Sequence, residues 1–216
     1  MTAWVIATRS AGKLAELRPM LAAHGILAVS LDDLGAVESP AEADIEIFDS
    51  FEANALAKAR HFAERTGSPC LADDSGLCID ALNGAPGVRS RRFAHDSGRS
   101  AVGEHAQDTA NNDAMLDACW DSGRAPPWPA HFACAAAYAD PAGRTLVAIG
   151  RTDGAIHADR AGTGGFGYDP YFMSAELGVS FATASLERKA SVSHRARAFA
   201  ALLALLTDKP HSAHDG

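Results

Sequence analysis

The sequence predicts an α/β fold on two observations. Over the first 80 residues, short apolar runs typical of strands alternate with longer segments whose apolar residues recur at helical spacing. Residues 131–138 and 145–150 are two further strand-like runs, separated by the turn sequence Asp140-Pro141-Ala142-Gly143, which indicates a β-hairpin. Alternation of strands and helices is the pattern of α/β proteins, and the hairpin adds strand chemistry without an intervening helix.

The chain opens with a strand pattern at Trp4-Val5-Ile6-Ala7. The polar loop Thr8 to Lys13 follows, and then a helical pattern with Leu14, Leu17 and Leu21. A strand, a polar loop with glycine and lysine, and a helix together aim backbone N–H groups and a lysine at an anion. The loop is not a Walker A motif, because Lys13 is followed by leucine and not by serine or threonine. An ordinary strand-to-helix turn explains the spacing equally well.

Three further helices are predicted. The most regular runs from an N-capping Ser50 to Gly67, where glycine gives the usual stop signal, and on it Lys58 and Arg60 are expected to be solvated. A second covers residues 111–121, and a closing helix begins at a cap at Ser191 or Ser193. His194 and Arg195 fall in the first turn of the closing helix. Positive charge there opposes the helix dipole, which favours a ligand-facing role.

The segment Leu71 to Leu77 places Asp73-Asp74-Ser75-Gly76 between apolar residues. Adjacent residues on an extended segment point to opposite faces, so the two aspartates cannot share one role. A cation, or a substrate carrying one, would explain two neighbouring carboxylates. Taken alone, the segment is better explained as an Asx-turn between two strands.

The segment Gly162 to Pro170 has four glycines around two aromatic residues, which makes it a poor strand and a poor core segment. Glycines let the backbone approach a flat ligand closely, and an aromatic ring offers stacking. Three arginines within residues 89–92 indicate either an anion site or a solvated loop.

Length and composition limit the classes of function. The 216 residues suit one domain of two lobes or two small domains. A net charge of −8 argues against a surface that coats nucleic acid, because phosphate binding needs clustered lysine and arginine. The sequence has no run of about 18 apolar residues for a membrane span and no signal-like N-terminus. The four cysteines form no CxxC pair, which favours buried thiols in a reducing, cytoplasmic compartment.

Taken together, these segments resemble the inosine triphosphate pyrophosphatase family over nearly the whole chain and in the same order. The resemblance lies in Ala7-Thr8 to Lys13, Ser50 to Ala55, Ala72 to Leu77, Gly84 to Val88, Gly162 to Pro170 and Lys189 to Arg195. It implies a long, twisted mixed sheet flanked by helices, in two lobes with the active cleft between them. Residues 1–207 would form this single domain, residues 208–216 a polar, disordered tail, and two copies a homodimer.

The resemblance implies hydrolysis of the α–β phosphoanhydride of inosine, xanthosine and deoxyinosine triphosphates, with magnesium required. The products would be a nucleoside monophosphate and pyrophosphate. By match to the family, Asp74 is the general base and a metal ligand, and Glu46 is the second metal carboxylate. The position of Glu46 is less closely matched, because Ile47-Phe48 stands where the family has Thr-Gly.

The resemblance also implies which residues bind the substrate. The triphosphate would contact Ser75 and the first loop, made of Thr8, Arg9, Ser10, Ala11, Gly12 and Lys13. The base would lie against Phe166, Gly167 and Tyr168, and its edge would be recognised by Asp169, Lys189, His194 and Arg195. Lysine and arginine only donate hydrogen bonds, so they favour a 6-oxo purine and leave the 6-amino group of adenine unpaired.

One departure from the family lies in the first loop, where Arg9-Ser10 stands in place of Gly-Asn. Arg9 either supplies a charged phosphate donor or points outward and weakens the site, so retained activity with a changed KM is expected. Two other functions stay open. One is a Maf-like nucleotide pyrophosphatase of different base preference, a group that lacks the Gly162 to Pro170 and Ser-His-Arg motifs. The other is a nucleotide-binding module without catalysis.

Overall fold

Six strands form one mixed sheet in the computed structural model, which describes residues 3–99 and 101–207. The sheet order is β2-β1-β3-β4-β5-β6, and β1 pairs in parallel with β2 and β3 whereas the other neighbours are antiparallel. The strands are β1 (Trp4–Ile6), β2 (Ala28–Ser30), β3 (Cys70–Ile79), β4 (Trp128–Ala139), β5 (Thr145–Ile156) and β6 (Phe172–Ser174). The prediction of an α/β fold with a mixed sheet is confirmed. The tail predicted at 208–216 lies outside the described residues.

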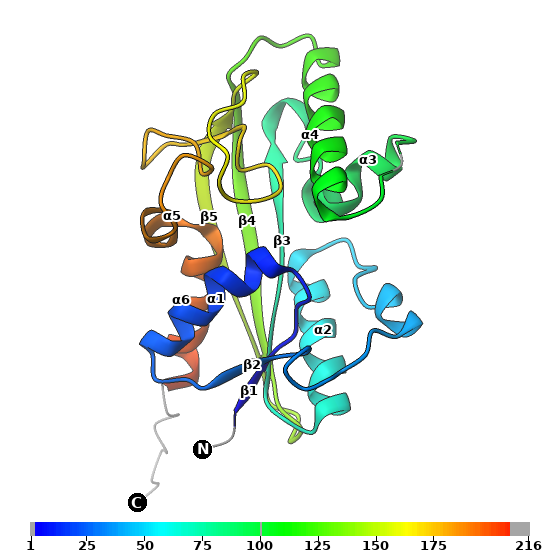
Figure 1. The fold of residues 1–216 in the computed structure, drawn as a ribbon, viewed down its shortest axis with the longest axis vertical. Helices are drawn as coiled ribbons and strands as arrows, with labels where there is room; N and C mark the ends of the chain where they lie inside the picture. Colours follow the sequence, from blue (N-terminus) through cyan, green and yellow to red (C-terminus); the bar gives the residue numbers. More distant parts are fainter. Residues whose placement is uncertain (1–2, 100, 208–216) are drawn as a thin grey trace, which may run out of the picture.

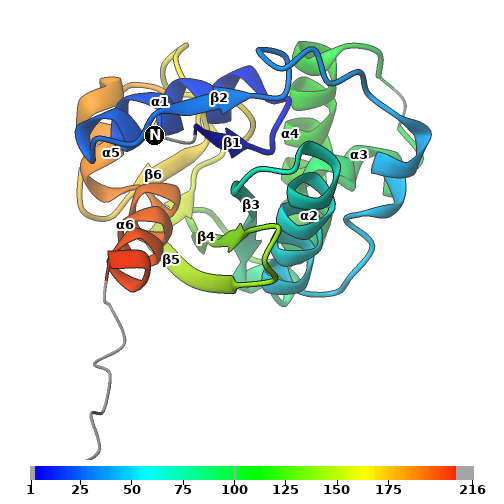
Figure 2. The ribbon, with the colours of Figure 1, turned by 90° about the horizontal axis from the view of Figure 1, so that it is seen from below.

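Helices cover both faces of this sheet (Figures 1 and 2). Helix α2 (Phe51–Thr66) packs on one face, and α1 (Ala11–Ala23) and α6 (His194–Thr207) pack on the other. Farther along β3 and β4 lie the remaining helical elements: α3 (Phe93–Asp96), α4 (Glu104–Asp121), α5 (Leu186–Val192) and the 3₁₀ helices η2 (Asp80–Leu82) and η3 (Gly87–Arg92), whereas η1 (Pro40–Asp44) precedes α2. Within the described ranges, no helix is both long and apolar enough to cross a membrane.

The predicted helix boundaries hold where the sequence has strong end signals. Ser50 caps α2, with its hydroxyl accepting a hydrogen bond from Ala53 N at 3.2 Å, and Gly67 ends the helix at φ +63°. Helix α4 instead begins at Glu104, well before the predicted start at residue 111. Its first two turns are polar and carry no apolar stripe, so hydrophobic periodicity does not reveal them.

The hydrophobic core is divided, and the two aspartates lie at the division. Leu71 and Ala72 belong to the two clusters that pack under α1, α6 and α2. Leu77 belongs to a third cluster, built around α4 and the far ends of β3 and β4. Residues 73–76 span the gap between these cores within one unbroken strand. The interpretation of Asp73 to Gly76 as an Asx-turn is therefore wrong.

Candidate active site

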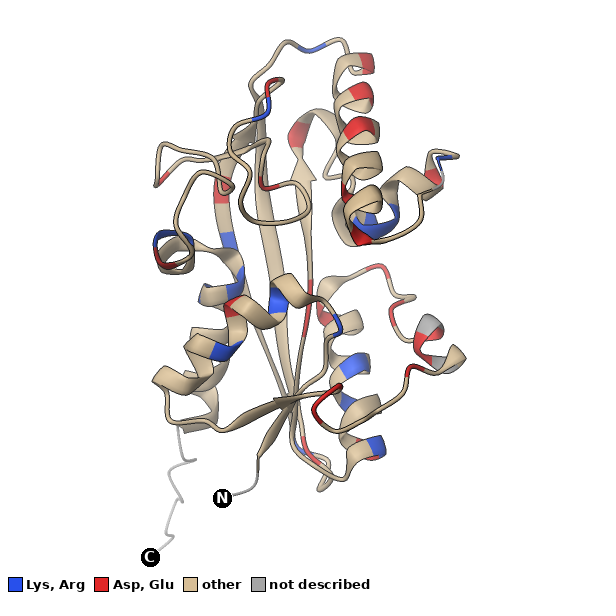
Figure 3. Ribbon diagram, in the orientation of Figure 1, with Lys and Arg blue, Asp and Glu red and all other residues tan. Residues whose placement is uncertain are grey.

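Strand β3 directs Asp73 and Asp74 to opposite faces of the sheet, as the alternation of side chains along a strand requires. Asp73 contacts α1 and α6, whereas Asp74 contacts α2. Figure 3 shows the acidic part of β3 with basic positions of α1 and α2 on either side of it. The expectation that the two carboxylates have different surroundings is confirmed.

Asp73 is fully buried and paired with cations from two helices. Its Oδ2 lies 2.9 Å from Lys13 Nζ and 3.1 Å from Arg195 Nε, and it accepts a hydrogen bond from Ser75 Oγ at 3.2 Å. Burial alone would raise the pKa of Asp73, but Lys13 and Arg195 hold it well below its usual value. Asp73 is thus a permanent anion that ties α1 and α6 to the sheet.

Asp74 has the opposite electrostatic character. Its carboxylate accepts hydrogen bonds from Asn54 Nδ2 at 2.9 Å and from the backbone N–H of Ser75 at 3.0 Å. Burial and the nearby Glu46 carboxylate raise the pKa of Asp74 more than Lys13 lowers it, so that it reaches about 6. A carboxyl whose pKa is near neutrality is suited to accept a proton from water.

Glu46 and Lys58 form an ion pair beside Asp74. Lys58 lies one turn after Asn54 on α2, so the same helix face presents an amide and an ammonium group to the acidic centre. The Lys58 side chain is only 12% exposed, so the prediction that it is solvated is wrong. From η3, Arg92 Nη2 donates a hydrogen bond to the backbone oxygen of Glu46 at 2.7 Å and so holds the loop that contains this carboxylate.

The first loop leads into α1 as predicted. Ser10 is the N-cap of the helix, and its own N–H donates to Thr8 Oγ1 at 3.2 Å. Lys13 reaches from the first turn of α1 to Asp73. At Gly12 a Cβ atom would lie 2.5 Å from Cδ1 of Phe166, so glycine is required for the aromatic ring to rest on the helix terminus. The first loop and the segment Gly162 to Pro170 therefore meet directly.

Arg9 is paired with Glu42 of η1 in this structure. Its guanidinium donates from Nε and Nη2 to the two carboxylate oxygens of Glu42 at 3.0 and 2.9 Å, and from Nη2 to Ala36 O at 3.0 Å. Glu42 also accepts a hydrogen bond from Arg65 of α2 at 2.8 Å. These contacts fasten η1 to the first loop.

A second group of buried charges lies beneath Phe166. Lys189 Nζ lies 2.5 Å from Asp169 and 2.8 Å from Glu16, and 4.8 Å from the centre of the Phe166 ring. Burial would lower the pKa of Lys189, but Asp169 and Glu16 raise it above its ordinary value, so the ammonium stays charged. Arg195 pairs with the same Glu16 and donates from Nη2 to Ser75 Oγ at 2.8 Å. The predicted base-recognition residues are thus brought together with the predicted catalytic strand.

His194 and Tyr168 are both buried, in different roles. His194 stacks on Phe132 at 4.7 Å between ring centroids, and burial together with Arg195 and Lys189 holds its pKa well below the usual value, so the ring is neutral. Its Nδ1 is buried and has no hydrogen-bond partner among the described residues. Tyr168 instead donates its hydroxyl hydrogen bond to Ser90 O at 2.7 Å. Tyr168 therefore anchors the segment Gly162 to Pro170.

Sequence reasoning missed three residues of this site, which are Glu16, Asn54 and Lys58. Asn54 carried a usable signal, because it is a polar residue on the apolar face of α2. Lys58 carried none. Glu16 lies among the leucines of α1, and its two partners on α5 and α6 are more than 170 residues away in sequence, so no local pattern reveals it.

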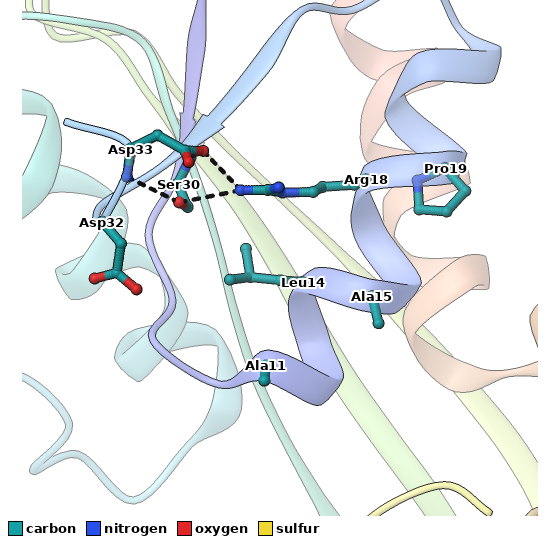
Figure 4. A pocket seen from close by; sticks show the side chains of 8 residues that line it. All are labelled: Ala11, Leu14, Ala15, Arg18, Pro19, Ser30, Asp32 and Asp33. Carbon is teal, nitrogen blue, oxygen red and sulfur yellow. Dashed lines mark hydrogen bonds and ion pairs between the residues drawn. The ribbon is translucent and has the colours of Figure 1, made fainter.

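A separate cavity of about 460 Å³ lies between α1 and the segment that follows β2 (Figure 4). Arg18 spans it and donates hydrogen bonds to Asp33 at 2.6 Å and to Ser30 Oγ at 3.2 Å. Of the predicted site residues, only Ala11 lines this cavity. It is therefore distinct from the candidate active site.

The mixed sheet covered by helices on both faces defines an α/β protein, with Lys13 and the adjacent carboxylates of β3 close to the start of α1 and to α2. The chain belongs to the Ham1 family, whose family model matches residues 4–205. This match confirms the resemblance on which the site residues were predicted.

Similar proteins and solved structures match this chain over almost its whole length. A dITP/XTP pyrophosphatase of Streptomyces coelicolor is 43% identical over 209 residues, covering 96% of this chain and 98% of the relative. The structure of a HAM1 protein from Coxiella burnetii is 33% identical and superimposes with a TM-score of 0.78, covering 97% of this chain and 100% of the other. A nucleoside-triphosphatase, or dITP/XTP pyrophosphatase, from Mycobacterium abscessus is 40% identical, with a TM-score of 0.68 and coverage of 94% and 99%.

Proposed function

We propose that this protein hydrolyses the deaminated purine nucleoside triphosphates dITP, XTP and ITP to the nucleoside monophosphate and pyrophosphate. The names of the Streptomyces coelicolor and Mycobacterium abscessus relatives support this activity. The observation that carries the proposal is Asp74, a buried carboxyl with a pKa of about 6. It lies beside Glu46 and interacts electrostatically with Lys13 and Lys58. An acid–base group in this setting matches attack by water on a phosphoanhydride.

Different residues of the chain activate the water and bind the triphosphate. Asp74 orients a water molecule and accepts its proton, while Asn54 holds the carboxylate in position from α2. Lys13, Ser75 and the N–H groups at the start of α1 bind the triphosphate, as helix N-termini do with phosphate groups. Lys58 keeps Glu46 ionised, because burial would raise the pKa of Glu46 whereas Lys58 and Lys13 lower it.

The carboxylates Asp74 and Glu46 fit a magnesium ion that binds together with its substrate. Magnesium takes oxygen ligands, and in nucleotide enzymes one or two carboxylates combine with substrate phosphates and water. In the described part of the chain, no three acidic, histidine or cysteine side chains gather into a site that would hold a metal alone. When bound, Mg²⁺ would neutralise charge that develops on the phosphates.

The base would be recognised beneath Phe166. Lys189 and Arg195 donate hydrogen bonds and match a 6-oxo purine, whereas the 6-amino group of adenine would meet donors only. The buried and unpartnered Nδ1 of His194, the residue before Arg195, offers another polar contact. Glu16, which pairs with both cations in this structure, must release part of these contacts when a purine edge binds.

We further propose that residues 1–207 act as one two-lobed domain, that two copies form a homodimer, and that the protein works in the cytoplasm. All four cysteines are buried and free, as expected for a reducing compartment. Light scattering coupled to gel filtration tests the homodimer, and a monomeric mass at micromolar concentration would contradict it.

A panel of nucleoside triphosphates with and without Mg²⁺ tests the function. Pyrophosphate release is expected to be at least about 100-fold faster from dITP, XTP and ITP than from dATP, because an unpaired buried polar group costs several powers of ten in discrimination. Preference for uridine or thymidine triphosphate would favour a Maf-like enzyme instead. Binding of dITP without release of pyrophosphate would favour a non-catalytic nucleotide-binding module.

The Arg9 departure gives a second test. Arg9→Met is expected to raise the KM for dITP about threefold to tenfold with little change in kcat. Its hydrogen bonds to Glu42, four residues before Glu46, hold η1 against the first loop, and hydrogen bonds between charged groups contribute about 1.5–3 kcal/mol. Arg60→Met, at an exposed position of α2, is the matched control. Arg9→Gly/Ser10→Asn is likewise expected to remain active with a changed KM. Kinetics identical to the wild type in both Arg9 variants would contradict this role.

A further inference from the structure

Two side chains of α4 hydrogen-bond to the segment Gly162 to Pro170 at one residue, Gly167. The backbone N–H of Gly167 donates to Asp108 Oδ2 at 2.8 Å, and its carbonyl oxygen accepts from Asn112 Nδ2 at 2.9 Å. Asp108 and Asn112 lie one turn apart on α4, and Asn112 Nδ2 also donates to the backbone oxygen of Asp108 at 2.8 Å. Both hydrogen-bonding groups of one glycine are thus held by side chains of one helix face.

These hydrogen bonds also constrain the backbone of Phe166, the residue before Gly167. The N–H of the peptide that precedes Phe166 donates to Asp169 Oδ2 at 2.9 Å, and the N–H of the peptide that follows it is the group held by Asp108. A carboxylate therefore fixes each of the two peptide planes on either side of the aromatic residue. Fixed peptide planes set the direction of the Cα–Cβ bond, so they set where the ring lies relative to Gly12, Lys189 and Arg195.

The hydrogen bonds of both α4 side chains to this segment end on Gly167, so these bonds affect the base through Gly167. Asn112 is buried, and Asp108 reaches the loop from the polar first turns of α4. A surface carboxylate with only a solvation role would not be matched by an amide that holds the other hydrogen-bonding group of the same residue.

We propose that Asp108 and Asn112 are positioning residues for purine recognition, which hold Phe166 in the orientation that stacks on the base. This inference rests on the proposed function, since it assigns to α4 the part of substrate binding that depends on the base and not on the phosphates. Stacking on an aromatic ring depends on the placement of that ring, whereas phosphate binding at α1 does not.

The test compares a ligand that has a purine with one that lacks it. In Asp108→Ala, the KM for dITP and the inhibition constant of dIMP are expected to rise about tenfold, a part of the usual contribution of base stacking. The kcat and the inhibition constant of inorganic tripolyphosphate are expected to stay within about twofold of the wild type. Asp108→Asn keeps an acceptor for the Gly167 N–H and is expected to restore dIMP binding.

Asp121→Asn is the matched control, because Asp121 is an exposed residue at the far end of the same helix. An equal loss of tripolyphosphate and dIMP binding in Asp108→Ala, or unchanged dIMP binding, would overturn the proposal. If Asp108→Ala does not fold, Asn112→Ser provides the same comparison. Should the wild type fail to turn over dITP, the proposed function fails, while the dissociation constants of dIMP for the same variants still decide the role of α4.

Discussion

Asp74→Asn is expected to lower kcat for dITP by about 100-fold to 10,000-fold, the usual contribution of a positioned general base. Asparagine keeps the size of the side chain and an acceptor for Asn54, but it cannot accept a proton from water. Steady-state kinetics with saturating Mg²⁺ measures the effect. Undiminished turnover in this variant would show that another group acts as the base.

The same substitution is expected to stabilise the metal-free protein. The pKa of Asp74 is about 6 in the folded chain, above the value of 3.8 for an unperturbed aspartate, so ionisation of this carboxyl opposes folding. That cost is absent below pH 4, grows between about pH 4 and 6, and is complete above pH 6. Its removal is expected to add up to about 3 kcal/mol to the free energy of unfolding at pH 7.5, at about 1.36 kcal/mol for each pKa unit.

Urea unfolding in the presence of a chelator measures this gain at pH 7.5 and again near pH 4, where it is expected to vanish. Asp153→Asn is a suitable control, because Asp153 is 66% exposed and its pair with Arg151 contributes little. A variant that loses both activity and stability at pH 7.5 would contradict the assignment of Asp74 as a strained functional carboxyl.

Asp73→Asn is expected to do the reverse and to destabilise the protein by about 3–5 kcal/mol, as removal of one partner from a buried ion pair does. The substitution leaves Lys13 and the fully buried Arg195 without their shared anion. Because the pKa of Asp73 lies well below its usual value, the stability it contributes is present above about pH 4 and is lost as the pH falls below that value.

Thermal and urea unfolding of Asp73→Asn, with the same Asp153→Asn control, measures this loss. Together the two variants separate the neighbouring aspartates, since one is expected to lose turnover and gain stability and the other to lose stability. Equal losses of kcat at unchanged stability would show that the division of roles between Asp73 and Asp74 is wrong.

The strongest sequence predictions concern contiguous segments with end signals. The strand, loop and helix at the N-terminus, the α2 boundaries at Ser50 and Gly67, and the hairpin of β4 and β5 all follow from local patterns. The closing helix also begins where predicted, with His194 and Arg195 in its first turn. The apparent conflict with the helix dipole is relieved in a way that no local pattern shows, because His194 is neutral and Asp73 and Glu16 neutralise Arg195.

What the sequence could not predict depends on contacts between distant segments. The direction of Arg9 is set by Glu42, which lies in the short 3₁₀ helix η1, an element that the sequence pattern did not predict. Every local criterion predicts that Lys58 is solvated. In the structure it is buried, because it pairs with Glu46 from the loop that precedes α2. The polar start of α4 carries no hydrophobic stripe, so the sequence does not predict it as a helix. The contact of Asp108 with Gly167, 59 residues away, appears only in the structure.

The reaction products test the central claim most directly. Wild-type protein incubated with dITP and Mg²⁺ and analysed by ion-exchange chromatography is expected to yield dIMP and pyrophosphate in equal amounts, with dATP left largely intact. Formation of dIDP and inorganic phosphate, or equal consumption of dATP, would contradict a pyrophosphatase that selects deaminated purines.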